Sequence, residues 1–315
     1  MRHLRILFMG TPEFSVPMLK AIHESKYELV GAVTAVDKPS GRGQKLSKSA
    51  VKEFAESKQI PLLQPKNMKS PEFLNQLKAF NPNLIVVVAF RMLPKQVWNF
   101  PEYGTFNLHA SLLPQYRGAA PINWAIINGE TKTGLTTFFL DEKIDTGEII
   151  DQIELPIEKT DNLENVYNKI LPKGVELVMT TIQTIEENET KTSKQTSEGV
   201  LKMAPKLTKE NTKVILDKKG EEIYNLVRGL SPYPLAWTTL QHGNEEIQCK
   251  ISKVFFHKSN HNKVNGEVKE ENKSLFVAVD DGWLELLELK LSGKRLLKVK
   301  DLMNGFQLKT PSKMI

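Results

Sequence analysis

Three polar residues lie where an α/β enzyme would carry its chemistry. Asn107 and His109 are two positions apart in the run 105–109, which predicts a strand, so their side chains share one face. Asp145 follows another predicted strand, residues 135–140. Open α/β sheets hold their ligands at the carboxyl ends of strands, where these three residues would meet. Taken singly, the Asn-x-His pair could be a satisfied core pair, and Asp145 could cap its own turn.

An amide donor, an imidazole and a carboxylate together supply what acyl transfer to an amine requires. Asn107 and His109 would stabilise the oxyanion that forms as the amine adds to a carbonyl carbon, each donor contributing about 3 kcal/mol. Asp145 would orient and charge the histidine, and could take the amine proton directly or through water. The sequence shows neither a serine or cysteine in a recognisable nucleophile setting nor a metal-ligand cluster. It therefore predicts direct transfer without an acyl-enzyme and without a metal.

Strand-like and helix-like patterns alternate through the first half of the chain. Five apolar runs predict buried parallel strands at 5–9, 29–35, 84–89, 105–109 and 135–140. Amphipathic stretches predict helices at 17–23, 50–58 and 71–80. This alternation favours a Rossmann-like, mostly parallel sheet with helices on both faces.

Two domains are expected from the length and the pattern. A long helix at 163–187, bent or interrupted by Pro172, would close a first domain that spans 1–188. The polar stretch 189–206 predicts a linker. Residues 207–315 carry a helical pattern followed by short strands with turn signals, which predict a small OB-like β-barrel.

Charge is unevenly divided between the two parts. Residues 1–200 contain 23 Lys plus Arg and 23 Asp plus Glu, whereas residues 201–315 contain 20 and 14. The whole net charge of +6 therefore lies in the C-terminal third. This excess indicates either a polyanionic partner or simply a lysine-rich surface.

Several classes of protein are excluded by what the sequence lacks. The longest apolar run, 84–90, is too short to cross a bilayer, and the N-terminus does not resemble a signal peptide, so a cytoplasmic protein is expected. Cys249 is the single cysteine, which excludes an internal disulfide and a thiolate metal cage. The loop 10–14 has one glycine where a dinucleotide fingerprint needs three, so an NAD enzyme is not expected. That loop could hold an anion or be a plain turn.

The segment 107–118, Asn-Leu-His-Ala-Ser-Leu-Leu-Pro-Gln-Tyr-Arg-Gly, resembles the signature of the folate-dependent formyltransferases, and Asp145-Thr146-Gly147 is similar to their second motif. The resemblance implies that Asn107, His109 and Asp145 are catalytic and that 10-formyltetrahydrofolate is the one-carbon donor. It assigns folate contacts to Phe90, Arg91, Leu93, Ser111, Leu112, Leu113, Pro114 and Ile144.

Two positions depart from the pattern of that family. Phe90-Arg91 stands where many relatives have Tyr-Gly, and Lys143 stands where a glycine is usual before the Asp-Thr-Gly motif. The detailed shape of the folate pocket therefore stays open, while the three catalytic positions are unchanged.

Four other segments are similar to the branch of this family whose substrate is methionyl initiator tRNA: 10–14, 117–121, 230–237 and 291–294. The resemblance implies transfer of the formyl group to the free amino group of the methionine, for translation initiation, by a monomer. It implies that the barrel holds the tRNA and that the flexible, basic insertion 37–48 contacts the acceptor stem. The candidate tRNA contacts are Arg42, Lys45, Lys48, Lys206, Lys209, Lys294, Arg295, Lys298 and Lys300. The insertion could instead be a solvated loop.

Three other functions stay open from the sequence. A related formyltransferase could act on a nucleotide-sugar amine, which would leave the basic insertion without a use. A formyltetrahydrofolate hydrolase would use water in place of the amine. An inactive scaffold that only binds RNA through its barrel would tolerate replacement of all three candidate catalytic residues.

Overall fold

The protein forms two compact units, seen in a computed structural model that describes residues 1–40, 45–196, 199–309 and 311–315. The first unit consists of residues 1–118, 134–155 and 168–203, and the second of residues 119–133, 156–167 and 204–315. The second unit thus takes in two segments that come from before residue 188.

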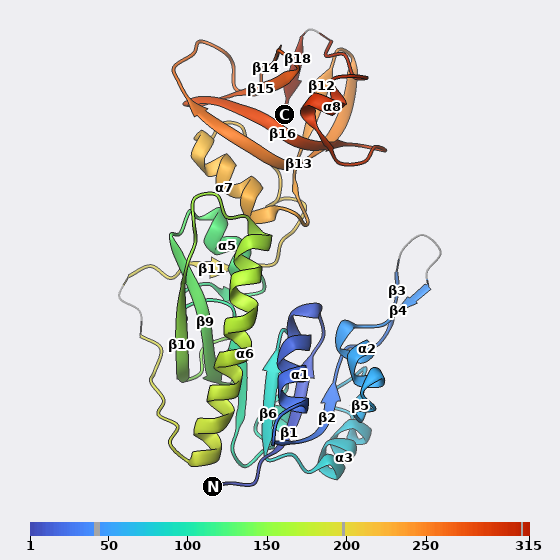
Figure 1. Ribbon diagram of the computed structural model, residues 1–315, viewed down its shortest axis with the longest axis vertical. Helices are drawn as coiled ribbons and strands as arrows, with labels where there is room; N and C mark the ends of the chain where they lie inside the picture. The colour runs from blue at the N-terminus through green and yellow to red at the C-terminus, as the bar shows by residue number, and fades with distance from the viewer. Residues whose placement is uncertain (41–44, 197–198, 310) are drawn as a thin grey trace. The chain divides into compact units, whose positions relative to one another are not determined.

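The first unit is built on a seven-stranded sheet with the order β10-β9-β7-β6-β1-β2-β5 (Figure 1). The strands are β1 (Arg5–Gly10), β2 (Glu28–Val33), β5 (Leu62–Leu63), β6 (Leu84–Val88), β7 (Thr105–His109), β9 (Lys132–Phe139) and β10 (Ile149–Pro156). β5, β2, β1, β6 and β7 run parallel to one another. The mostly parallel sheet predicted from the apolar runs is confirmed.

One strand direction was predicted wrongly. The run 135–140 was expected to be parallel to its neighbours, but β9 pairs antiparallel with β7, with Asn107 opposite Phe138 and His109 opposite Thr136. An apolar run reports burial on both faces of a sheet and carries no information about direction, so the sequence pattern could not detect the reversal.

Helices cover both faces of this sheet (Figure 1). They are α1 (Val16–His23), α2 (Ala50–Ser57), α3 (Pro71–Phe80), α4 (Lys95–Trp98) and α6 (Leu163–Glu187), with a 3-10 turn at Glu13–Ser15. α3 begins as predicted, because the Ser70 hydroxyl accepts a hydrogen bond from the Phe73 amide at 3.3 Å. α6 is continuous through Pro172 and is not interrupted there.

Alternate residues of β1 face the two helical layers. Leu7 and Met9 pack in one buried cluster with Phe73 and Leu77 of α3. α6 approaches the other layer so closely that a Cβ at Gly174 would lie 2.5 Å from Met18 of α1. A side chain at residue 174 would therefore require the end of the Met18 side chain to move.

The described residues of the segment 189–203, predicted to be part of a linker, pack along the first unit. Ser193 forms an isolated antiparallel bridge with Ile149, and the Tyr116 amide donates to the Lys202 carbonyl at 2.6 Å.

Two further pairs of short strands complete the first part of the chain. β8 (Arg117–Gly118) pairs with β11 (Met203–Ala204), and β3 (Lys38–Ser40) pairs with β4 (Lys45–Ser47) in the basic insertion. The β3–β4 ladder was not expected in a segment predicted to be a flexible loop.

The second unit contains the predicted small barrel. Its strands follow the order β14-β15-β16-β13-β12-β18, and a bridge between Glu267 and Lys313 joins the two ends. They are β12 (Ala236–His242), β13 (Glu245–Lys258), β14 (Val268–Glu271), β15 (Ser274–Val279), β16 (Gly282–Leu291), β17 (Leu297–Lys298) and β18 (Ser312–Met314). The helices of this unit are α5 (Pro121–Ile127), α7 (Gly220–Leu230) and α8 (Val299–Leu302). Ile223 and Val227 of α7 lie in the core of the barrel.

Candidate active site

Asn107 and His109 lie on one face of β7, as the period of a strand requires. Asn107 is half-buried, and within the described ranges its carboxamide has no hydrogen-bond partner. His109 is buried, with 7% of its surface exposed. A free amide donor therefore lies two residues from a fixed imidazole, and the core-pair alternative for this motif does not hold for Asn107.

Both ring nitrogens of His109 face oxygen atoms of the protein. Nε2 lies 2.8 Å from the Tyr116 carbonyl oxygen, and because a carbonyl can only accept, Nε2 carries a proton. Nδ1 lies 3.8 Å from Oδ2 of Asp145, too far for a hydrogen bond and close enough for an ion pair. Phe138 meets the imidazole edge to face, with ring centroids 6.5 Å apart. The ring can donate toward a substrate only from Nδ1, which requires the second proton.

The Asp145 carboxylate is aimed at the site and does not cap its own turn. Its Oδ2 accepts from the Gly118 amide at 2.9 Å, and its backbone is left-handed with φ 56°. Asp141 does the capping instead: its carboxylate accepts from the Lys143 amide at 2.9 Å and from the Thr146 hydroxyl at 2.8 and 2.9 Å. The turn-cap alternative therefore applies to Asp141.

One residue that the sequence did not single out, Gln195, holds the Asp145 loop. The Gln195 side-chain amide donates to the carbonyl oxygens of Asp145 at 3.0 Å and Gly147 at 2.8 Å. Its Oε1 accepts from Nε of Arg117 at 3.1 Å and from a terminal guanidinium nitrogen at 2.6 Å. Gln195 thereby connects the loop after β7 to the loop after β9. Its place in a polar stretch resembling a linker gave no signal of this role.

The two segments predicted to contact folate lie near the Asp145 loop and β7. Lys95 at the start of α4 forms an exposed ion pair with Glu142 at 2.5 Å, so the 90–95 segment lies beside the Asp145 loop. The hydrogen bond from Lys95 lowers the pKa of the Glu142 carboxyl. Ser111 is buried, and its hydroxyl donates to the Gln115 carbonyl at 2.6 Å.

The apolar side chains of these segments differ in exposure. Leu93 and Leu113 are buried, Phe90, Leu112 and Pro114 are half-buried, and Ile144 is 60% exposed. Arg91 donates to the carbonyl oxygens of Pro65 and Lys66, and its guanidinium lies 5.7 Å from the ring centroid of Phe90. The arginine that replaces a usual glycine is therefore bound to the neighbouring backbone.

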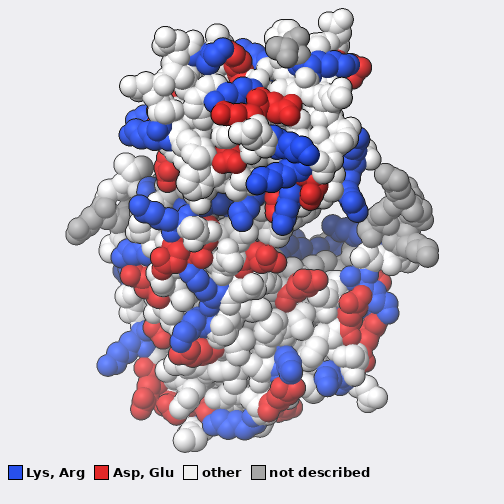
Figure 2. Space-filling view, turned by 45° about the horizontal axis from the view of Figure 1, so that its top comes forward, with Lys and Arg blue, Asp and Glu red and all other residues white. Residues whose placement is uncertain are grey.

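The candidate tRNA contacts fall into three groups. Arg42 and the side chain of Lys45 lie outside the described residues. Lys48 is paired with Glu56 at 2.7 Å, and this hydrogen bond raises the pKa of Lys48. The remaining six are exposed on the second unit: Lys206, Lys209, Lys294, Arg295, Lys298 and Lys300. Acidic side chains lie among the lysines and arginines over the face shown in Figure 2, so net charge alone does not locate a binding surface.

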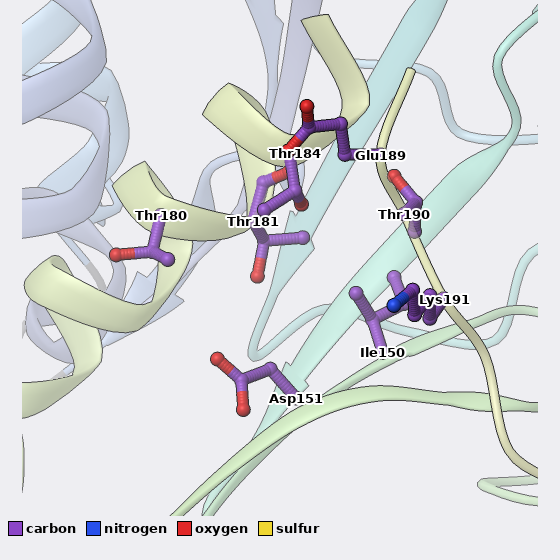
Figure 3. Close-up of a pocket in the computed structure, with 8 residues that line it drawn as sticks. All are labelled: Ile150, Asp151, Thr180, Thr181, Thr184, Glu189, Thr190 and Lys191. Carbon is purple, nitrogen blue, oxygen red and sulfur yellow. The ribbon is translucent and has the colours of Figure 1, made fainter. Parts of the chain in front are cut away.

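A separate hollow of about 560 Å³ lies between β10, α6 and the segment after α6 (Figure 3). Its lining is rich in threonine: Ile150, Asp151, Thr180, Thr181, Thr184, Glu189, Thr190 and Lys191. None of the candidate catalytic or folate-contacting residues is among them.

Across the described ranges, we find no group of three or more His, Cys, Asp or Glu side chains able to hold a metal ion. Nor does any helix in those ranges combine the length and apolar character needed to span a membrane.

The site combines an amide, an imidazole and a carboxylate at adjoining strand ends of a Rossmann-like sheet, which are the groups that acyl transfer to an amine requires. The chain belongs to the formyl transferase family: residues 4–182 match the model described as formyl transferase, and residues 206–307 match that of the formyl transferase C-terminal domain. The family predicted from the motifs is confirmed.

Two relatives that match this chain along its whole length are methionyl-tRNA formyltransferases. The methionyl-tRNA formyltransferase of Flavobacterium johnsoniae is 50% identical over 314 residues, covering 100% of both chains. That of Bacteroides fragilis is 47% identical over 318 residues, covering 99% of this chain and 98% of its own. Among solved structures, WlaRD, a sugar 3N-formyl transferase crystallised in the presence of dTDP and 5-N-formyl-THF, shares the fold with a TM-score of 0.65. It is 22% identical and covers 94% of this chain and 100% of its own.

Proposed function

We propose that this chain transfers the formyl group of 10-formyltetrahydrofolate to the free amino group of methionyl initiator tRNA, giving N-formylmethionyl-tRNA for translation initiation. The observation that carries the proposal is the unpartnered Asn107 carboxamide beside the His109–Asp145 pair, in a chain 50% identical to a methionyl-tRNA formyltransferase along its whole length. The proposal places the reaction in the cytoplasm and the enzyme as a monomer.

We propose that the three residues divide the chemistry as follows. Asn107 donates from its NH2 group to the formyl oxygen as the amine lone pair bonds to the formyl carbon. His109, with Nε2 held by the Tyr116 carbonyl, donates from a protonated Nδ1 to the same oxygen. Asp145, at 3.8 Å from that nitrogen, stabilises the imidazolium and accepts the proton that the amine loses. The carbon–nitrogen bond to the donor then breaks, and the donor nitrogen takes up the proton.

The residues present suit a folate donor. Leu93, Leu113 and the exposed Ile144 are proposed as apolar contacts for a flat ring. Lys206, Lys209, Lys294, Arg295, Lys298 and Lys300 are proposed as phosphate contacts, together with the insertion residues Arg42, Lys45 and Lys48. In this proposal the catalytic domain spans 1–188, the linker 189–206 and the tRNA-binding domain 207–315.

A formyl-transfer assay with charged initiator tRNA tests the proposal. Asn107→Ala should lower kcat by roughly 100- to 1,000-fold, the usual effect of removing one oxyanion donor. Asn99→Ala, an exposed asparagine at the end of α4, is the matched control and should be fully active. Folate consumed without formylated methionine would instead indicate a hydrolase, and formylation of a nucleotide-sugar amine but not of methionyl-tRNA would indicate the sugar branch.

A further inference from the structure

A hollow of about 400 Å³ opens on the outer side of the barrel, within the second unit. The groups that matter in its lining are one aromatic ring, two lysines, two hydroxyls and one amide: Trp237, Lys209, Lys250, Thr208, Thr212 and Gln248. The volume falls in the range of sites that bind small ligands. The rest of the lining is apolar: Leu207, Pro234 and Leu235. The hollow therefore combines an aromatic and apolar surface with cations and neutral polar groups.

Trp237 is fixed as a platform with its ring turned outward. Along β12, burial alternates so that Trp237 points away from the barrel core. The indole Nε1 donates to the Lys209 carbonyl at 2.7 Å, and the Trp237 main chain is bonded on both sides to the 212–214 segment. The ammonium groups of Lys209 and Lys213 lie 5.1 and 5.5 Å from the ring centroid. The edge of the indole is thus anchored, while two lysine ammonium groups lie near its ring face.

Lysines continue from this ring across the sheet in register. Lys250 on β13 lies directly opposite Trp237, and Lys290 on β16 lies directly opposite Lys250. Like charges directly opposite one another in an antiparallel pair are destabilising. Within the part of the chain that the structure describes, none of Lys209, Lys213, Lys250 and Lys290 forms an ion pair with a carboxylate. A bound polyanion would remove this repulsion.

Resting on the proposed function, we propose that Trp237 and the four-lysine row, Lys209, Lys213, Lys250 and Lys290, bind one unpaired nucleotide of the RNA substrate. The base stacks on the indole, and the phosphates on either side pair with the lysines that leave the ring face. Only an unpaired base can do this, because a base inside a duplex is covered by its neighbours. The Gln248 carboxamide, exposed at the rim, offers a donor and an acceptor to the base edge.

Equilibrium binding of initiator tRNA to the full chain at several salt concentrations tests the two halves of the site separately. Trp237→Leu should weaken binding by roughly 5- to 150-fold without changing the salt dependence, because stacking is not a counterion effect. Trp237→Phe keeps a ring and should recover most of the affinity. Lys250→Gln should lower the slope of log Kd against log salt by about one, and Lys258→Gln on the same strand should leave both quantities unchanged.

A short single-stranded oligoribonucleotide and a blunt RNA duplex separate stacking from plain charge. The single strand should compete with the tRNA and lose affinity in Trp237→Leu, whereas the duplex should be insensitive to that change. Equal affinity of Trp237→Leu and unmutated protein for tRNA, or Phe as damaging as Leu, would overturn the stacking site. The two proposals can fail independently. If the stacking site is overturned but the unmutated protein formylates methionyl-tRNA, the proposed function is still supported. If the protein does not formylate methionyl-tRNA, the oligoribonucleotide experiment still tests whether Trp237 stacks on an unpaired base.

Discussion

Replacing Gln195 should slow formyl transfer, although this residue lies fifty positions from the carboxylate it supports. Gln195→Ala removes the two hydrogen bonds that hold the carbonyl oxygens of Asp145 and Gly147 and the two that come from Arg117. Each hydrogen bond to a neutral carbonyl contributes about 1 kcal/mol. Losing the two bonds to the Asp145 and Gly147 carbonyl oxygens therefore removes about 2 kcal/mol of the free energy that holds the loop in place. This corresponds to a fall of up to roughly 30-fold in the population with Asp145 in place.

The expected result is a loss of kcat with little change in KM. Gln195 donates to the main chain of the Asp145 loop, so it positions the carboxylate and does not itself meet the amine. Misplacing a catalytic group by about 1 Å can cost roughly 100-fold in rate, which sets the upper bound for the variant. Initial rates measured with each substrate varied in turn separate the two constants.

A second variant distinguishes the hydrogen bonds that Gln195 donates to the loop from those that it accepts from Arg117. Gln195→Glu keeps an oxygen for the Arg117 guanidinium but replaces the donor NH2 by an oxygen that faces two carbonyls. It should therefore be at least as slow as Gln195→Ala. Gln183→Ala removes an exposed amide that donates to Glu187 on the same helix; it is the matched control and should be unaffected. Full kcat in Gln195→Ala would refute the reasoning, and full kcat in Gln195→Glu would assign the whole effect to Arg117.

Three further outcomes follow from the geometry. A Cβ at residue 147 would lie 1.7 Å from the Phe139 carbonyl oxygen, so Gly147→Ala should both lower the melting temperature by several degrees and reduce kcat. Burial raises the pKa of the Cys249 thiol to about 11, so a thiol reagent at pH 8 should react with it only after unfolding, and rapid labelling of the folded chain would contradict this. The hydrogen bond from Lys26 lowers the pKa of Glu186. A lowered folded-state pKa stabilises the fold above the unfolded pKa and loses that effect as pH falls through the folded one. The difference in melting temperature between the unmutated chain and Glu186→Gln should therefore be present at pH 7 and vanish at acid pH; a difference independent of pH would exclude the ion pair as its source.

The periodicity of the sequence was enough to place two of the candidate residues. Asn107 and His109 share a face because strand side chains alternate, and the structure keeps them on one face. Strand period and burial are local properties, so five apolar runs and three amphipathic helices were predicted at the right places. The antiparallel direction of β9 was missed, because direction depends on how the chain returns to the sheet and not on the run itself.

Long-range contacts explain what the sequence could not show. Gln195 lies in a segment whose Thr, Ser, Lys and Glu content is typical of a linker, yet its side chain has four hydrogen bonds in the first unit. The β3–β4 ladder likewise lies within a basic, glycine-rich stretch that predicted a loop. Composition reports whether a segment can form a core, and it does not report which polar side chain finds a partner far along the chain.

The loop around Asp145 shows why a three-residue motif can locate a site even though one of its neighbours departs from the usual pattern. Asp145 adopts a left-handed backbone, which turns its carboxylate toward His109. Thr146 ties the turn to Asp141 through its hydroxyl, and Gly147 allows the chain to pass against a carbonyl that any side chain would strike. Each position has its own physical requirement, so the triplet is restrictive. Lys143, one of the two departures noted in the sequence, is not left-handed: its amide donates to Asp141, and its carbonyl oxygen accepts from the Thr146 hydroxyl at 3.3 Å. Both contacts use the main chain, so any residue other than proline satisfies that position.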